Sequence, residues 1–151
     1  MSAKITSALG KKKQSLSIVI TGNKNGVIGI GRAKGANSQA AIRLAKVNAA
    51  KRLLKIDLFE NRTLFHNFYQ EYYYTKIHAE KKPAGYGIKA HRIIHTICTL
   101  LGIKDIHVRL VGSNNVLNVC KAFINGLLKQ VNNKYLFQFF FYFSLSLSLS
   151  I

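Results

Sequence analysis

The segment from Ala90 to Leu127 restricts the fold more than any other part of this sequence. From Ala90 to Leu101 the apolar residues recur at intervals of three and four, the spacing of one face of an α-helix. Gly102 follows, where a helix end favours a left-handed residue. Residues 106–110 then alternate between apolar and polar, as in a half-buried strand. A second stripe at helical spacing comprises Val116, Cys120, Phe123 and Leu127. Two amphipathic helices around an amphipathic strand predict a two-layer α+β module.

The residues before this module predict a hairpin. Leu16–Ile20 is a short β-rich run, and Asn25-Gly26 is a strong turn signal before a returning strand at Val27–Ile30. Gly31–Gly35 is expected to form a basic, flexible loop.

One helix is expected to follow the hairpin. Asn37 or Ser38 can cap its start with a side chain, and the helix is expected to end near Leu54 or Ile56. Its apolar stripe comprises Ile42, Ala45, Ala49, Leu53 and Ile56.

An aromatic segment connects the two parts. Two strands are expected, roughly Thr63–Tyr69 and Tyr73–Glu80, because aromatic side chains suit a half-buried sheet face. The aromatic side chains between Phe65 and Tyr74 are more typical of packing than of base stacking. Pro83–Gly87 then breaks the pattern.

The C-terminal tail is different in composition. Tyr135–Ile151 is rich in Phe, Ser and Leu, with no helical period and no turn signal. We expect residues 131–151 to be a low-complexity tail, disordered or translated from non-coding sequence. A membrane anchor is the rival interpretation, although the apolar part is short and rich in serine.

The charge balance indicates a polyanionic partner. Lys and Arg number 23 against 5 Asp and Glu, which gives a formal net charge of +18. Nucleic acid relieves the self-repulsion of such a chain, and an anionic membrane surface is the second possibility. The hydrophobic content of 48% argues against a disordered basic tail.

The glycine-rich segment does not fit a nucleotide-binding loop. Its glycines at 29, 31 and 35 are spaced GxGxxxG, and no Gly-Lys-Ser/Thr ending follows. Two other interpretations can hold together. The glycines can form turns that need positive φ angles, and the loop can place Arg32 and Lys34 against RNA phosphates.

No cofactor, metal or catalytic site is expected. His91 and His95 lie four apart on a helix, but the Glu of HExxH and a third ligand are missing. The acidic residues are scattered and pair with no nucleophile or base. Cys98 and Cys120 lie on apolar helix faces and are expected to be small buried hydrophobes.

Several separated motifs resemble the small-subunit ribosomal protein family S-five. Gly22–Lys34 looks like its strand-turn-strand signature, and Lys104–Val119 looks like its closing strand, Gly-Ser-x-Asn turn and final helix. Arg62–His66, Lys81–Gly87 and His91-Arg92 are similar to the mitochondrial branch.

The resemblance implies two modules. Residues 11–58 would form a β-hairpin and helix like a double-stranded-RNA-binding domain, and residues 62–130 a two-layer β-α-β-α module. The implied function is structural, in the mitochondrial small ribosomal subunit near the mRNA entrance. The implied partners are small-subunit rRNA, the ribosomal proteins three, four and eight, and mRNA nearby, with no small-molecule substrate and no membrane. A free double-stranded-RNA-binding regulator is the alternative function.

The RNA-binding residues are expected to be basic or to lie in turns. By position, Gly10–Lys13 matches the family's basic loop between the first two strands, and Gly112–Asn114 matches its turn. The expected contacts are Lys11, Lys12, Lys13, Lys24, Arg32, Lys34, Lys46, Lys81, Lys82, Lys89, Arg92, Ser113 and Asn114.

Two departures from the family pattern carry expectations of their own. The residues before Gly10 look unrelated to the family's first strand, so the N-terminal sheet is expected to lack an edge. The chain is also expected to be truncated at its N-terminus and to end in an aberrant tail.

Overall fold

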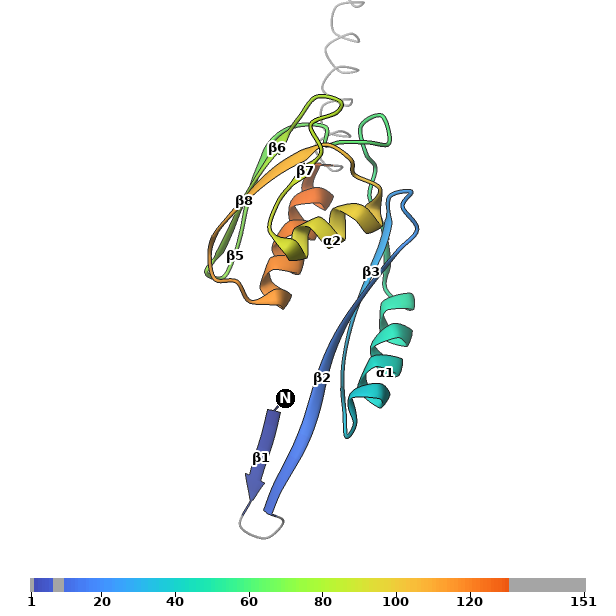
Figure 1. Ribbon diagram of the computed structural model, residues 1–151, viewed down its shortest axis with the longest axis vertical. Coiled ribbons are helices and arrows are strands. Elements are labelled where there is room, and N and C mark those ends of the chain that lie inside the picture. The colour runs from blue at the N-terminus through green and yellow to red at the C-terminus, as the bar shows by residue number, and fades with distance from the viewer. Residues whose placement is uncertain (1, 7–9, 131–151) are drawn as a thin grey trace, which may run out of the picture. The chain divides into compact units, whose positions relative to one another are not determined.

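The computed structural model describes residues 2–6 and 10–130, with two compact units (Figure 1). The first comprises Met1–Lys55 and Thr99–Gly102, and the second comprises Ile56–Cys98 and Ile103–Ile151. The expected low-complexity tail, residues 131–151, lies outside the described residues. The structure of each unit is α+β, as predicted.

The first unit is built on a four-stranded antiparallel sheet in the order β1-β2-β3-β4. The predicted hairpin is present between β2 and β3, with Gly26 at a φ of 79° in its turn. One helix, α1, lies along one face of this sheet (Figure 1). The bounds are Ser2–Thr6 for β1, Gly10–Gly22 for β2, Val27–Gly35 for β3, Ser38–Ala50 for α1 and Leu53–Lys55 for β4.

The glycine-rich segment is a strand and not a loop. β3 continues through Gly35, and of its glycines none has a positive φ. A Cβ on Gly31 would lie 1.9 Å from the carbonyl oxygen of Ala45, and one on Gly29 would lie 2.4 Å from that of Ala49. These glycines therefore allow the backbones of β3 and α1 to approach closely. The loop expectation is wrong, and the positive-φ expectation holds for Gly26 but not for the glycines of β3.

This close approach also determines which face of α1 is buried. Ala41, Ala45 and Ala49 are fully buried, whereas Ile42 is 40% exposed. Only methyl-sized side chains fit against the glycine-lined strand. Of the predicted stripe, Ala45, Ala49 and Ile56 are buried as expected, whereas the placement of Ile42 and Leu53 is wrong. The predicted side-chain cap is absent as well, because Asn37 occupies the N-cap position without a side-chain hydrogen bond.

Two further boundaries of the first unit differ from prediction. The helix ends at Ala50, and Leu53–Lys55 forms β4, paired with β3. Leu53 continues the helical spacing of the apolar residues, but in the structure it belongs to the edge strand of the sheet. On the other side, β1 pairs with β2 from Ser2↔Gln14 to Thr6↔Gly10. The sheet therefore has the edge strand that was expected to be missing, and Lys11–Lys13 lie within a strand.

The second unit contains a four-stranded sheet in the order β5-β6-β8-β7, with only the β7–β8 pair parallel. Figure 1 shows α2 and the last helix, residues 116–130, on the same side of this sheet. The bounds are Phe68–Tyr72 for β5, Thr75–Lys81 for β6, Ile88–Lys89 for β7, Arg92–Leu101 for α2 and Ile106–Gly112 for β8. The predicted β-α-β-α order is confirmed, but both aromatic strands begin later than expected.

Turns and caps of the second half follow the sequence closely. Gly102 and Gly112 have φ angles of 93° and 92°, in the left-handed region that glycine favours. The Asn115 side-chain oxygen accepts the Leu117 backbone N–H at 3.1 Å and caps the last helix. Val116 is 42% exposed, so the predicted stripe of this helix begins at Cys120.

The core of the second unit lies between the sheet and its two helices. Ile77 and Ile106 from the strands are fully buried, as are Ile97 and Phe123 from the helices. The Phe68 and Phe123 rings lie 6.1 Å apart, and Gly126 leaves space for Phe68. Both cysteines are buried and free, as predicted.

Candidate nucleic-acid interface

Charge is distributed unevenly along the chain. Residues 1–55 contain 12 Lys and Arg and no acidic residue, and the five acidic residues all lie between Asp57 and Asp105. No carboxylate of the first unit can therefore neutralise its cations. Such a surface attracts a polyanion by releasing the counterions of that polyanion.

Arg32 and Lys34 lie on the face of β3 opposite α1. Successive strand residues point to opposite sides of a sheet, and the glycines at 29, 31 and 35 face the helix. Both cationic side chains are exposed and are paired in register with Ile18 and Leu16 of β2. The structure thus brings these two predicted contacts to one surface.

Lys46 is exposed on α1, which covers the other face of the same sheet. One RNA surface formed by the sheet face alone cannot include Lys46 together with Arg32 and Lys34. Lys24 lies in the β2–β3 turn with a φ of 62° and is exposed. The side chains of Lys11, Lys12 and Lys13 lie outside the described part of the structure.

Three predicted lysines of the second unit already have partners. The Lys81 ammonium lies 3.5 Å from the centroid of the Phe59 ring. The Lys82 ammonium lies 2.8 Å from a Glu80 carboxylate oxygen and 5.5 Å from the Tyr86 ring centroid. The Lys89 ammonium lies 4.4 Å from the same Tyr86 ring. Lys82 and Lys89 therefore lie together around one aromatic side chain, whereas Lys81 lies beside another.

The Glu80 carboxylate is held in its charged form. Its hydrogen bonds with Lys82 and His107 lower the pKa of Glu80, and the same contact with Glu80 raises the pKa of Lys82. The Nδ1 atom of His107 lies 3.4 Å from Glu80.

The remaining predicted contacts lie at helix starts. Arg92 is exposed at the first position of α2. The Ser113 backbone N–H donates to the Tyr74 carbonyl at 2.9 Å, and the Ser113 carbonyl accepts from the Thr75 hydroxyl at 2.9 Å. Asn114 is exposed in this turn. These contacts give Ser113 a structural role, and its contact with RNA stays a prediction, as does that of Asn114.

The described residues contain no group of three or more His, Cys, Asp or Glu side chains that could hold a metal ion. The Nδ1 atom of His91 lies 3.4 Å from the Ile93 backbone nitrogen, as an acceptor at the start of α2. Within residues 2–6 and 10–130, no helix is long and apolar enough to cross a membrane.

Comparison with known proteins identifies the family. The model of the ribosomal protein S5 N-terminal domain matches residues 1–57, and that of the ribosomal protein S5 C-terminal domain matches residues 70–138. The small ribosomal subunit protein uS5 of Pelagibacter ubique is 33% identical over 127 residues, which cover 84% of this chain and 75% of that protein. The chain belongs to the ribosomal protein S5 family. This is a family of structural, non-enzymatic ribosomal proteins, which agrees with the expectation that the chain is not an enzyme.

Relatives of this S5-family chain include longer proteins. The mouse small ribosomal subunit protein uS5m is 39% identical over 132 residues, and its fission yeast counterpart is 31% identical over 121 residues. The matched segments cover 87% and 80% of the chain but only 31% of each relative. The chain thus spans about a third of the length of these relatives.

Proposed function

We propose that the chain is a structural constituent of the mitochondrial small ribosomal subunit and binds its rRNA mainly through the first unit. The observation that carries this proposal is the charge of residues 1–55, which have 12 cationic and no acidic side chains in a chain of the S5 family. Lys and Arg without acidic neighbours suit contacts to phosphates, which position a protein on RNA without reading its sequence.

The phosphate contacts are proposed at two sets of residues. In the first unit they are Arg32 and Lys34 on the sheet face, Lys24 in the turn, Lys46 on α1, and Lys11, Lys12 and Lys13 on β2. In the second unit they are Lys81, Lys82, Lys89 and Arg92, with Ser113 and Asn114 in the turn before the last helix. Residues 11–58 and 62–130 are the proposed RNA-binding and S5-type modules.

The names of the relatives support the proposed location. Proteins similar to this chain in mouse, cow and worm are named small ribosomal subunit protein uS5m, which supports a mitochondrial location. Small-subunit rRNA is the main partner in this proposal. The neighbouring proteins three, four and eight, and mRNA close by, are further partners.

A salt titration of RNA binding tests the phosphate contacts. Removing Arg32 and Lys34 together by alanine substitution is expected to lower the slope of log affinity against log salt by about two, roughly one unit for each contact. Lys104→Ala with Lys129→Ala is the matched control, because it removes the same charge from exposed positions of the second unit. Equal slopes for the two double variants would contradict the assignment.

Sedimentation of mitochondrial lysate tests the cellular role. The tagged chain is expected to travel with small ribosomal subunits in a sucrose gradient. Recovery only in light RNA–protein fractions would support the free regulator instead. Recovery with membranes after gradient flotation would contradict both.

A further inference from the structure

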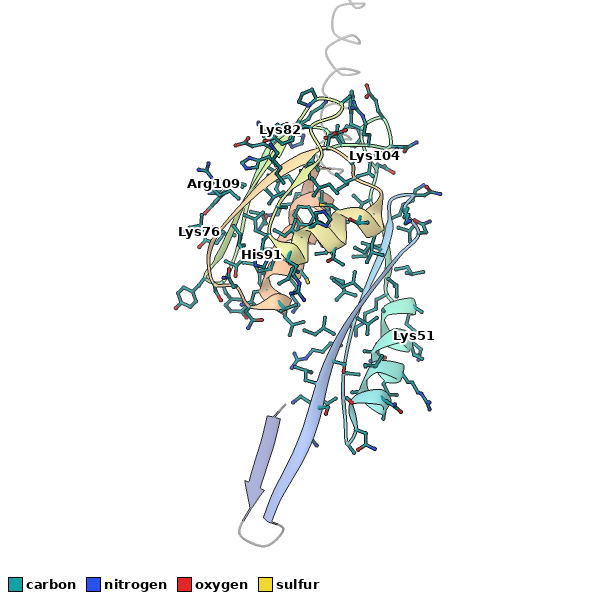
Figure 2. All side chains as sticks on the ribbon, in the orientation of Figure 1. Lys51, Lys76, Lys82, His91, Lys104 and Arg109 are labelled. Carbon is teal, nitrogen blue, oxygen red and sulfur yellow. The ribbon has the colours of Figure 1, made fainter. Side chains whose placement is uncertain are left out.

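Within the second unit, both described helices lie on one side of the sheet, and the other face is covered by neither of them. Side chains that alternate with the buried Ile77 and Val108 point to this face, away from α2 and the last helix. Figure 2 shows Lys76, Lys82 and Arg109 on the side of the sheet away from α2. Because no helix covers them, these side chains are free to meet a ligand along the width of the sheet.

A first row of flat, polar side chains crosses three strands of this face. Tyr69 on β5 is paired in register with His78 on β6, and His78 is paired with Arg109 on β8. The Tyr69 and His78 rings lie 4.6 Å apart between centroids. All three residues are exposed, and Tyr69 is 51% exposed. A phenol, an imidazole and a guanidinium therefore lie side by side on an open sheet.

A second row lies about 7 Å further along the strands, two residues away. His107 is paired with Glu80 on one side and with Lys89 on the other. The Tyr86 ring lies 6.4 Å from the His107 ring, and the Lys89 ammonium approaches it to 4.4 Å. This row repeats the combination of aromatic and cationic side chains.

The loop that carries Tyr86 is held in place by two hydrogen bonds of Gly87, one to a side chain and one to the backbone. The Gly87 N–H donates to the buried Asp105 carboxylate at 3.0 Å, and the Ile106 N–H donates to the Gly87 carbonyl at 3.1 Å. The backbone next to Tyr86 is therefore held in place before any ligand arrives, which lowers the entropy lost on binding.

The electrostatics of the face favour an anion. Lys76, Lys82, Lys89 and Arg109 outnumber the two carboxylates, Glu71 and Glu80. Each carboxylate has a cationic partner on the same face, since Glu80 lies 2.8 Å from Lys82 and Glu71 lies 4.0 Å from Lys76. The surplus charge is thus left on the side of Lys89 and Arg109.

We propose that this open face binds unpaired RNA, with bases stacking on the rows of Tyr69 and Tyr86 and phosphates contacting Arg109 and Lys89. Aromatic rings and guanidinium groups on an open sheet suit unstacked bases, whereas paired bases in a duplex keep their faces covered. The inference rests on the proposed function, in which RNA is the partner and Lys89 is already a phosphate contact. It assigns a second surface, distinct in ligand from the cationic first unit.

Fluorescence anisotropy with two RNA probes tests this surface in the full chain. The probes are an unstructured oligouridine and a fully paired RNA duplex. Tyr69→Ala combined with Arg109→Ala is expected to weaken oligouridine binding about tenfold or more while changing duplex binding less than about twofold. Arg109→Lys keeps the charge that contacts a phosphate but loses the planar, forked guanidinium, and is expected to weaken oligouridine binding less than Arg109→Ala.

The controls separate stacking from general effects. Tyr74→Ala removes an exposed aromatic ring (83% exposed) in the β5–β6 turn and is expected to leave both affinities unchanged. Ultraviolet crosslinking of oligouridine is expected to label peptides that contain Tyr69 or Tyr86. Unchanged oligouridine binding in the Tyr69/Arg109 variant, or equal losses for both probes, would overturn this inference and leave the rRNA-binding role proposed for the first unit intact. Failure of the parent chain to bind either RNA would overturn the proposed function itself.

Discussion

At the scale of single residues, Gly31 is the position where side-chain size matters most. Its φ is not in the left-handed region, but a Cβ there would lie 1.9 Å from the Ala45 carbonyl oxygen and 2.5 Å from the Ala49 nitrogen. Gly31→Ala is therefore expected to lower the free energy of unfolding by about 1–3 kcal/mol through overpacking, measured by urea denaturation. Gly85→Ala is the matched control, because Gly85 has a φ of 86° but no atom within 4 Å of a Cβ. A larger loss of stability in Gly85→Ala would mean that the strain of a left-handed backbone costs more than the steric overlap at Gly31.

Asp105 is a second residue that is expected to contribute strongly to stability, because its carboxylate is buried and hydrogen-bonded. Its carboxylate accepts from the Arg62 guanidinium at 3.2 Å and from the Gly87 N–H at 3.0 Å, with a side chain only 5% exposed. Asp105→Ala leaves a donor without its partner in a partly buried site, so we expect a loss of about 2–3 kcal/mol. Glu60→Ala removes the other, exposed partner of Arg62 and is expected to cost less than about 1 kcal/mol. Similar losses in the two variants would show that Asp105 is no more important than a surface ion pair.

At the scale of elements, the two cysteines report on the helices that cover the second sheet. Burial raises the pKa of Cys98 on α2 to about 12 and that of Cys120 on the last helix to about 11. In the unfolded chain a thiol loses its proton at about pH 8.5. Because the unfolded state then binds fewer protons than the folded state, these thiols lower stability as the pH rises above about 8.5, until the folded pKa is reached.

This linkage gives a measurable pH dependence. The free energy of unfolding is expected to fall more steeply between about pH 9 and pH 11 in the parent chain than in Cys98→Ala, since the variant lacks one raised thiol. Denaturation at several pH values measures the slopes. The native chain is also expected to resist thiol-reactive reagents near neutral pH. Parallel curves for the two proteins, or rapid labelling of native Cys98, would contradict the burial of this helix face.

At the scale of the whole molecule, the net charge of +18 sets the response to salt. The Debye length falls from about 30 Å at 0.01 M salt to about 8 Å at 0.15 M, so added salt screens repulsion between distant cations. Without RNA, the Tm is expected to rise over this range, as measured by circular dichroism. Hydrogen exchange is expected to show the larger gain in the first unit, where no acidic residue offsets the cations. A Tm that falls with salt would indicate that ion pairs of the second unit dominate.

Much of the second unit was predictable from the sequence because its signals are local. The period of residues 90–101 and the glycines at 102 and 112 depend on the geometry of a single helix or turn. The family resemblance rested on motifs of the same kind, and the comparisons confirm it.

Only the tertiary structure decided the boundaries and surfaces. The buried face of α1 is formed by Ala41, Ala45 and Ala49 because glycines of β3 lie against it. The spacing of apolar residues within the helix does not contain this information. Residues 53–55 become a strand because β3 offers an edge to pair with. The row of Tyr69, His78 and Arg109 depends on the register of three strands that are separated in sequence. Composition and local period thus determined the class of fold and the charge of the chain, whereas long-range pairing decided which side chains meet, since contacts between distant segments leave no local pattern.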